Sequence, residues 1–162
     1  MQDPHVAFFD RLRRLIPGGA PWGPLQRGAR ELERGRLEAA QASFDEALSA
    51  AVNAEDVAAA RNKRAIIALK RGDRAAAIAE LILALEVQPR SPPAITTIGN
   101  LLLEDAAIDD AIAHYEYAIL IDDTYAPAYH NLGVALHRSG RRGEAVRMLR
   151  KATRLEVRAR RT

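Results

Sequence analysis

The sequence has no cysteine, few aromatic residues (5% of the chain) and no long apolar run. Without thiols, neither a disulfide framework nor a thiolate metal site can form, which fits a reducing compartment. The first residues lack the basic start and apolar core of a secretory signal. The longest apolar stretch, residues 75–85, contains Glu80 and is far shorter than the roughly 20 residues that span a bilayer. We therefore expect a cytoplasmic protein.

Motifs of catalysis and metal binding are also missing from the sequence. There is no phosphate-binding Walker loop, no G-x-S-x-G, no H-E-x-x-H and no calcium loop. His130 and His137 are two helical turns apart, too far to share one metal ion. We expect no enzyme, no cofactor and no metal.

Small residues recur along the 162-residue chain at a fixed period of about 34 residues. One shift by this period places Gly133 on Gly99 and Ala145 on Ala111. A period of this size indicates a repeat architecture in which each unit buries its apolar face against a neighbour. The abundance of alanine favours closely packed helices over a sheet.

Glycine turns and helical periodicity predict four helix pairs. Their expected ranges are 22–34 with 37–51, 56–70 with 74–87, 92–104 with 108–121, and 125–138 with 142–158. A short amphipathic helix is expected over residues 4–16, ending at Pro17. Two apolar stripes should face the core: one of Ile108, Ala111, Ile112, Tyr115 and Ala118, and one of Ile78, Leu81 and Leu85.

The fourth unit resembles a tetratricopeptide (TPR) repeat, a helix-turn-helix of about 34 residues. Its matching residues are Tyr129, Leu132, Gly133, Leu136, Gly140, Ala145, Leu149 and Ala152. The third unit matches with Ile95, Ile98, Gly99, Leu102, Ala106, Ala111, Tyr115 and Ala118, and the second with Ala65, Ala68, Gly72, Ala77, Leu81 and Ala84. Three residues depart from the pattern, because Glu31, Arg61 and Arg64 stand where an apolar side chain is usual.

The resemblance implies an all-α fold, a right-handed α-solenoid of about four TPR units with a short N-terminal helix. The expected division is an N-terminal helix and linker at 1–20, units at 21–57, 58–91, 92–125 and 126–157, and a basic tail at 158–162. Gly35 and Gly72 stand 37 positions apart, so the spacing between the first and second units exceeds the period. We assign this excess to a longer loop around residues 53–56.

The same resemblance implies a scaffold or adaptor that binds an extended peptide in the concave groove of the first (A) helices of the pairs. The implied groove residues are Asn62, Lys63, Ile66, Lys70, Thr96, Thr97, Asn100, Leu103, His130, Asn131, Val134, His137 and Arg138. Asn100 and Asn131 match asparagines that hydrogen-bond a peptide backbone, for which an amide is suited because it both donates and accepts. The alternative for Asn131 is a bond to the neighbouring helix. The basic groove side chains favour a peptide with acidic residues, although ordinary solvated charge explains them equally well.

The chaperone-binding members of the family use a carboxylate clamp of Lys, Asn and Arg. Here Asn62 and Ile66 stand in place of its lysine and first asparagine. We therefore do not expect chaperone C-terminal tails as the ligand.

Charge is distributed unevenly near the C-terminus. Residues 104–123 include seven acidic residues and no Lys or Arg, whereas residues 138–161 include ten basic residues against two acidic ones. The alternative function is therefore nucleic-acid or other polyanion binding through the arginine-rich last helix. No aromatic residues are interleaved with these arginines to stack on bases, which disfavours single-strand recognition.

Both ends of the array carry apolar residues. We expect Val146, Leu149, Leu155 and Val157 to leave an uncapped apolar surface that self-associates or docks a partner. The helix over residues 4–16 is expected to cap the first unit. Partner docking is its second candidate role, and binding to an anionic membrane ranks last.

Overall fold

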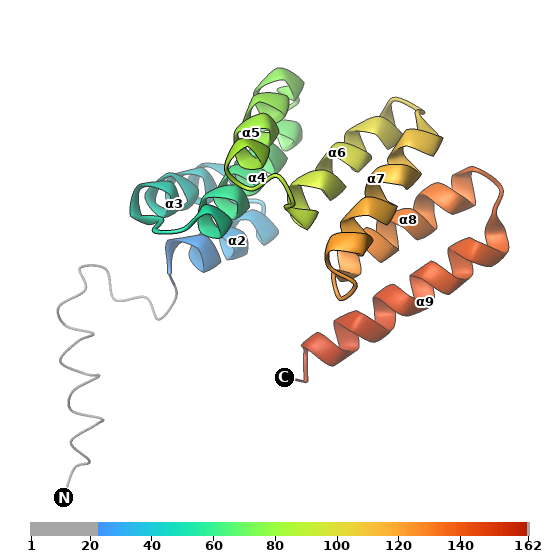
Figure 1. The fold of residues 1–162 in the computed structure, drawn as a ribbon. Helices are drawn as coiled ribbons and strands as arrows, with labels where there is room; N and C mark the ends of the chain where they lie inside the picture. The colour runs from blue at the N-terminus through green and yellow to red at the C-terminus, as the bar shows by residue number, and fades with distance from the viewer. Residues whose placement is uncertain (1–22, 162) are drawn as a thin grey trace, which may run out of the picture.

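The computed structural model describes residues 23–161, which form eight helices and no strand. The helices pair in sequence order: α2 (Pro24–Glu33) with α3 (Leu37–Ala50), α4 (Ala54–Lys70) with α5 (Arg74–Val87), α6 (Pro92–Glu104) with α7 (Ile108–Ile121), and α8 (Ala126–Arg138) with α9 (Arg142–Ala159). Figure 1 shows these pairs stacked one after another along the chain. The all-α solenoid is confirmed. The predicted helix over residues 4–16 lies outside the described residues.

The turns inside the four pairs share one backbone feature. Gly35, Gly72 and Gly140 adopt φ values of 72°, 79° and 84°, and Ala106 occupies the equivalent position with φ 59°. The left-handed conformation closes a helix C-terminus and costs an L-residue roughly 1 kcal/mol, which explains why glycine fills three of the four turns. Ala106 bears that cost in the third unit.

Glycines inside the A helices let the two helices of a pair approach closely. A Cβ atom on Gly99 would lie 2.6 Å from Tyr115 Cε1, and one on Gly133 would lie 2.7 Å from Leu149 Cγ. Ala111 and Ala145 are 0% and 1% exposed, so the small residues that set the period lie in the core. Side-chain size at these positions therefore fixes the distance between the helices.

The wider spacing between the first and second units comes from a longer helix and not from a longer loop. Asn53 caps α4, with its Oδ1 accepting from the Asp56 backbone N–H at 2.8 Å. This bond satisfies one of the free N–H groups of the first turn. The expected long loop is therefore corrected: α4 begins at Ala54 and has 17 residues, against 13 in α6 and in α8.

The arginines that replace apolar residues in α4 are neutralised from α5. Glu80 Oε2 lies 3.1 Å from Arg61 Nη1, and Glu80 Oε1 lies 2.8 Å from Arg64 Nη2. Arg64 also pairs with Asp45 of α3 at 3.2 Å, so the cluster joins the first two units. Glu31, the other departure, pairs with Arg36 and Arg34.

The stripe predicted in the third unit faces the core, whereas the stripe predicted in the second is partly wrong. Leu81 is 2% exposed, but Ile78 is 43% exposed and Ile82 54%. Helical spacing could not distinguish the buried apolar residues of α5 from the exposed ones, because α5 is apolar over most of its circumference. Among the described helices, none is long and apolar enough to cross a membrane.

Candidate peptide-binding site

The A helices line the inner side of the curved array. The backbone of α4 lies close to that of α6, and α6 lies close to α8, whereas the backbones of α5 and α7 are farther apart. Because helices on the inner side of a bend lie closer together, α4, α6 and α8 form the concave face. Figure 1 shows α5, α7 and α9 as the second members of their pairs.

The thirteen predicted groove residues differ in their access to solvent. The buried members are Asn62, Thr96, Thr97 and Leu103, the half-buried ones are Lys63, Ile66, Asn100, Asn131 and Val134, and the exposed ones are Lys70, His130, His137 and Arg138. A ligand on this face therefore meets the half-buried and exposed sets, because buried side chains offer little area for contact.

Asn62 and Thr97 join two units together. The Thr97 hydroxyl lies 2.8 Å from Asn62 Oδ1 and 3.0 Å from the Pro93 carbonyl oxygen, so its one proton is shared between these acceptors. Asn62 is 3% exposed and Thr97 5%. This bond links α4 to α6 and orients the floor of the groove.

Asn100 and Asn131 come together as part of a three-residue network with Tyr115. The Asn131 amide donates to Asn100 Oδ1 at 2.7 Å, and the Tyr115 hydroxyl donates to the same oxygen at 2.8 Å. Both donors converge on Asn100 Oδ1, so the amide group of Asn100 is held in one orientation. Within the described chain, the Nδ2 donors of Asn100 and the side-chain Oδ1 of Asn131 then remain available to a ligand.

Tyr115 was identified in the sequence only as a packing residue. It is 0% exposed, and burial raises its pKa to about 12, so its hydroxyl keeps its proton at neutral pH. The sequence signal that could have revealed its second role is a tyrosine on the B helix opposite an asparagine on the A helix of the same unit.

A small cavity opens beside this network. Its volume is about 260 Å³, and its lining residues are Asn100, Leu103, Glu104, Asn131, Val134 and Arg138. Arg138 Nη1 donates to the Leu103 carbonyl oxygen at 3.3 Å, which bridges α8 to α6 at one end of the cavity. The cavity therefore offers amide donors and acceptors, apolar side chains and a guanidinium within one short stretch.

Comparison with known proteins agrees with the helix-pair fold. The sequence model of the tetratricopeptide repeat family matches residues 126–156. The crystal structure of MamA is similar over 97% of this chain and 90% of its own, with a TM-score of 0.58 and 22% identity. Residues 126–156 form a TPR repeat, and the chain has the fold of TPR solenoids.

Two further TPR structures share the fold. The second TPR of Spaghetti (RPAP3), bound to the HSP90 peptide SRMEEVD, covers 62% of this chain and 94% of its own with a TM-score of 0.55 and 20% identity. YrrB, a TPR protein with an unusual peptide-binding site, covers 97% of this chain and 82% of its own with a TM-score of 0.52 and 22% identity. No curated protein matches the sequence.

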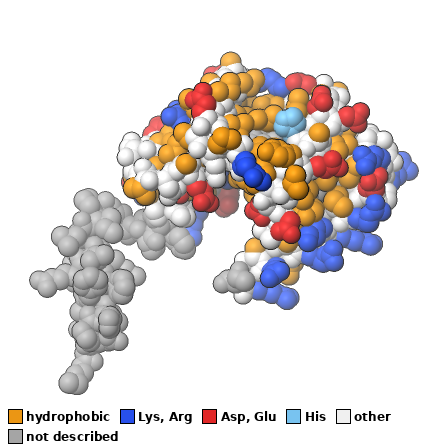
Figure 2. Space-filling model, in the orientation of Figure 1, with side chains coloured by type: hydrophobic (Ala, Val, Ile, Leu, Met, Phe, Trp, Pro, Cys, Tyr) orange, Lys and Arg blue, Asp and Glu red, His pale blue; other side chains and the backbone are white. Residues whose placement is uncertain are grey.

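A second concave surface of the TPR array lies on the last helix pair. It encloses about 1030 Å³ and is lined by Tyr129, Arg147, Met148, Leu149, Arg150, Lys151, Thr153, Arg154 and Val157. Lys151 Nζ lies 5.6 Å from the centre of the Tyr129 ring. Of the four residues predicted to be uncovered, Val146 and Val157 are 46% and 44% exposed, whereas Leu149 and Leu155 are half-buried. Figure 2 shows Lys and Arg side chains gathered over this part of the molecule.

Clusters that could bind a metal are absent from residues 23–161. No group of three or more His, Cys, Asp or Glu side chains converges there. His130 and His137 are both exposed on α8. Hydrogen bonding and charge are the chemistry that the described surfaces offer.

Proposed function

We propose that this TPR protein is a scaffold that binds an extended segment of a partner protein along its concave face. The observation that carries the proposal is the fixed orientation of Asn100, which directs an amide donor into the groove beside the Asn131 carbonyl oxygen. An extended peptide presents one N–H and one C=O per residue, so a paired donor and acceptor is suited to its backbone. Peptide binding by the RPAP3 domain and YrrB supports the same function.

The charge of the concave face favours a partner segment with acidic residues. Lys63, Lys70 and Arg138 lie along α4 and α8, with Glu104 at the cavity rim as an opposing charge. Complementary charge accelerates encounter and fixes register more than it adds affinity. The HSP90 peptide SRMEEVD also has acidic residues, but this chain lacks the carboxylate clamp, so we propose an internal acidic segment as the ligand.

The proposed role is that of an adaptor without catalytic activity, located in the cytoplasm. The sequence carries no recognised catalytic motif and no cysteine, which supports both parts of the proposal.

Peptide selection from a displayed random library tests the proposed groove. Peptides enriched on the wild-type protein should bind it in a fluorescence polarisation assay. Asn100→Ala should weaken that binding at least tenfold, because it removes the Asn100 amide donor and also the hydrogen bond that orients the Asn131 side chain. Gln41→Ala is the matched control, since it removes an amide from α3, outside the groove. Selected peptides that bind Asn100→Ala and Asn131→Ala as tightly as wild type would refute the groove.

Polyanion binding through α9 is the second candidate. Arg150, Arg154 and Arg158 are exposed and form no ion pair with another described residue. Phosphate contacts make affinity fall steeply with salt. Retention of a duplex oligonucleotide at about 50 mM salt that disappears at about 300 mM, and that survives Asn100→Ala, would favour this function over the groove.

A further inference from the structure

The outward faces of α7 and α9 occupy equivalent positions in successive repeats but differ in chemistry. On α7 the outward row is Asp109, Ala113, Glu116 and Leu120, at spacings of four, three and four residues that keep it on one side of the helix. One repeat later the equivalent row on α9 is Gly143, Arg147, Arg150 and Arg154. We call these the acidic ridge and the basic ridge.

Neither ridge is neutralised within the described part of the chain. Asp109 and Glu116 are exposed and form no ion pair there, and the same holds for Arg150 and Arg154. Elsewhere charges pair across helices, as Arg74 does with Glu104 at 3.4 Å. Arg141 interacts with the acidic ridge only through space. Its pKa is raised mainly by its hydrogen bond to Glu144, and the charges of Glu116 and Asp109 raise it further. Two exposed stripes of opposite sign thus lie on one molecule.

Each ridge also carries exposed apolar side chains. Leu120 is 76% exposed and Tyr117, beside it on α7, is 44% exposed. On α9 the basic ridge borders the 1030 Å³ concave surface, whose apolar residues include Met148, Leu149 and Val157. A protruding leucine flanked by acids fits a hollow with apolar residues flanked by arginines, because desolvated apolar contact and opposite charge then act together.

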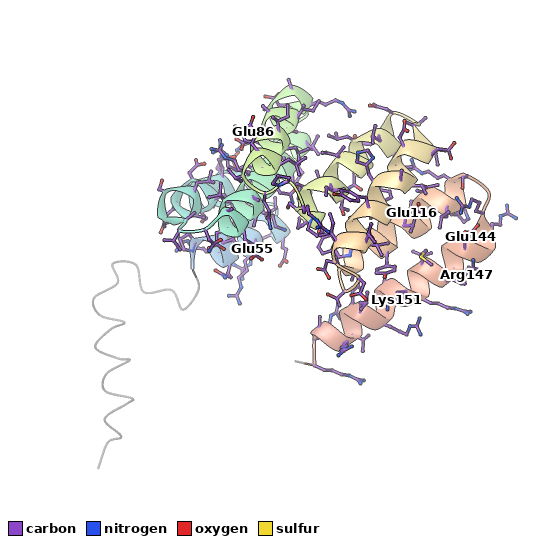
Figure 3. All side chains as sticks on the ribbon, viewed as in Figure 1. Glu55, Glu86, Glu116, Glu144, Arg147 and Lys151 are labelled. Atoms are coloured by element: carbon purple, nitrogen blue, oxygen red, sulfur yellow. The ribbon has the colours of Figure 1, made fainter. Side chains whose placement is uncertain are left out.

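We infer that the two ridges are the two halves of one interface, through which a second copy of this chain docks with its acidic ridge on the basic ridge of the first. Both α7 and α9 pack on α8, and successive repeats differ by only a small rotation, so the ridges face the same side of the array. Figure 3 labels Glu116 on α7 and Arg147 and Lys151 on α9. A two-fold axis that runs parallel to α7 and α9 and midway between them places the acidic ridge of each copy on the basic ridge of the other, so both contacts form together.

The size of the ridges makes the dimer weak. α7 has 14 residues and is about 21 Å long, so two ridges of about 10 Å width bury about 400 Å² on each copy. This is half the area of a standard interface, and we expect a dissociation constant at or above about 10 μM. Because charge contributes much of the attraction, the dimer should dissociate as salt rises.

Sedimentation velocity of the full chain tests the interface. At about 50 mM salt the wild type should shift from monomer to dimer as its concentration rises to about 200 μM, and at about 500 mM it should remain monomeric. Glu116→Arg and Arg150→Glu should each weaken the dimer at least tenfold, because each places like charges opposite one another. An equimolar mixture of the two variants should restore it, since every contact then joins opposite charges.

Two controls separate this interface from general charge and apolar effects. Glu86→Arg makes the same charge change on the outward face of α5 and should leave dimerisation unchanged. Leu120→Ser should weaken the dimer, whereas Val52→Ser, at a 91% exposed position before α4, should not. Circular dichroism of each variant confirms that it folds.

Three results would overturn the inference. The first is a wild type that stays monomeric at every concentration in low salt. The second is a dimer unaffected by Glu116→Arg and Arg150→Glu. The third is a mixture of these variants that stays monomeric, which would mean that the two residues do not face each other.

Discussion

Replacing Glu80 with glutamine should destabilise the protein by roughly 2 kcal/mol, as expected for a partly buried ion pair that loses its shared acid. Glu80 is the common partner of Arg61 and Arg64, at 3.1 and 2.8 Å, and its side chain is only 12% exposed. Removing one member of a fully buried ion pair costs about 3–5 kcal/mol because the other charge stays buried. The two arginines are 28% and 27% exposed, so water partly compensates them and the cost is reduced.

The two arginines should not contribute equally to that loss. Arg64 keeps Asp45 as a partner at 3.2 Å when Glu80 is neutralised, whereas no second carboxylate pairs with Arg61 among the described residues. Most of the cost should therefore come from Arg61. Replacing Arg61 with methionine in the Glu80→Gln background should recover about half of it, because an apolar side chain is usual at this position and leaves no charge unpaired.

Urea denaturation followed by circular dichroism measures these changes, with Glu46→Gln as the control. Glu46, the partner of Arg27, is 58% exposed against 12% for Glu80, so the loss of this pair should cost less than about 0.5 kcal/mol. A Glu80→Gln variant as stable as this control would refute the reasoning, since the cluster would then behave as an ordinary surface pair.

Three further predictions follow from the packing and the turns. Gly99→Ala should destabilise the protein by about 2–3 kcal/mol in urea titrations, and Gly133→Ala should destabilise it by less. The reason is that α7 is held between α6 and α8, whereas α9 contacts only α8 among the described helices and can move away. The opposite order would contradict this account. Ala106→Gly should raise the thermal midpoint by relieving a left-handed alanine worth about 0.5–1 kcal/mol, and a lower midpoint would exclude strain there. Burial raises the pKa of Tyr115 and of Tyr125 from 10.0 to about 12, so the unfolded chain loses these protons first and the free energy of unfolding should fall between pH 10 and pH 12. Tyr125→Phe should flatten that fall, and an unchanged slope would count against a buried Tyr125.

The sequence predicts the scaffold well because the scaffold depends on side-chain volume at regular intervals. Gly99, Gly133, Ala111 and Ala145 recur in phase, and the structure places all four between packed helices. Turn positions follow from the same regularity. Among the helices of residues 23–161, α4 departs from the prediction, because Asn53 caps it and an expected loop is instead an additional stretch of α-helix.

The candidate site is less predictable, because a repeat position specifies a helix face but not the partner across it. Asn62 occupies a groove position yet bonds Thr97 in the next unit, and Asn100 depends on Tyr115 of its own unit for its orientation. These bonds join residues 35 and 15 positions apart, beyond the range of helical periodicity. The pairing of Arg61 with Glu80 is hidden for the same reason.

The outward positions of the B helices are where this repeat protein can diversify at little cost. Core positions of α5, α7 and α9 are constrained by contact with their own A helices. The outward row is apolar on α5 except for Glu86, acidic on α7 and basic on α9. Each repeat therefore presents an outward surface of different chemistry on a common frame. Substitutions that change one outward row can alter the set of partners while the folding energy of the array stays nearly the same.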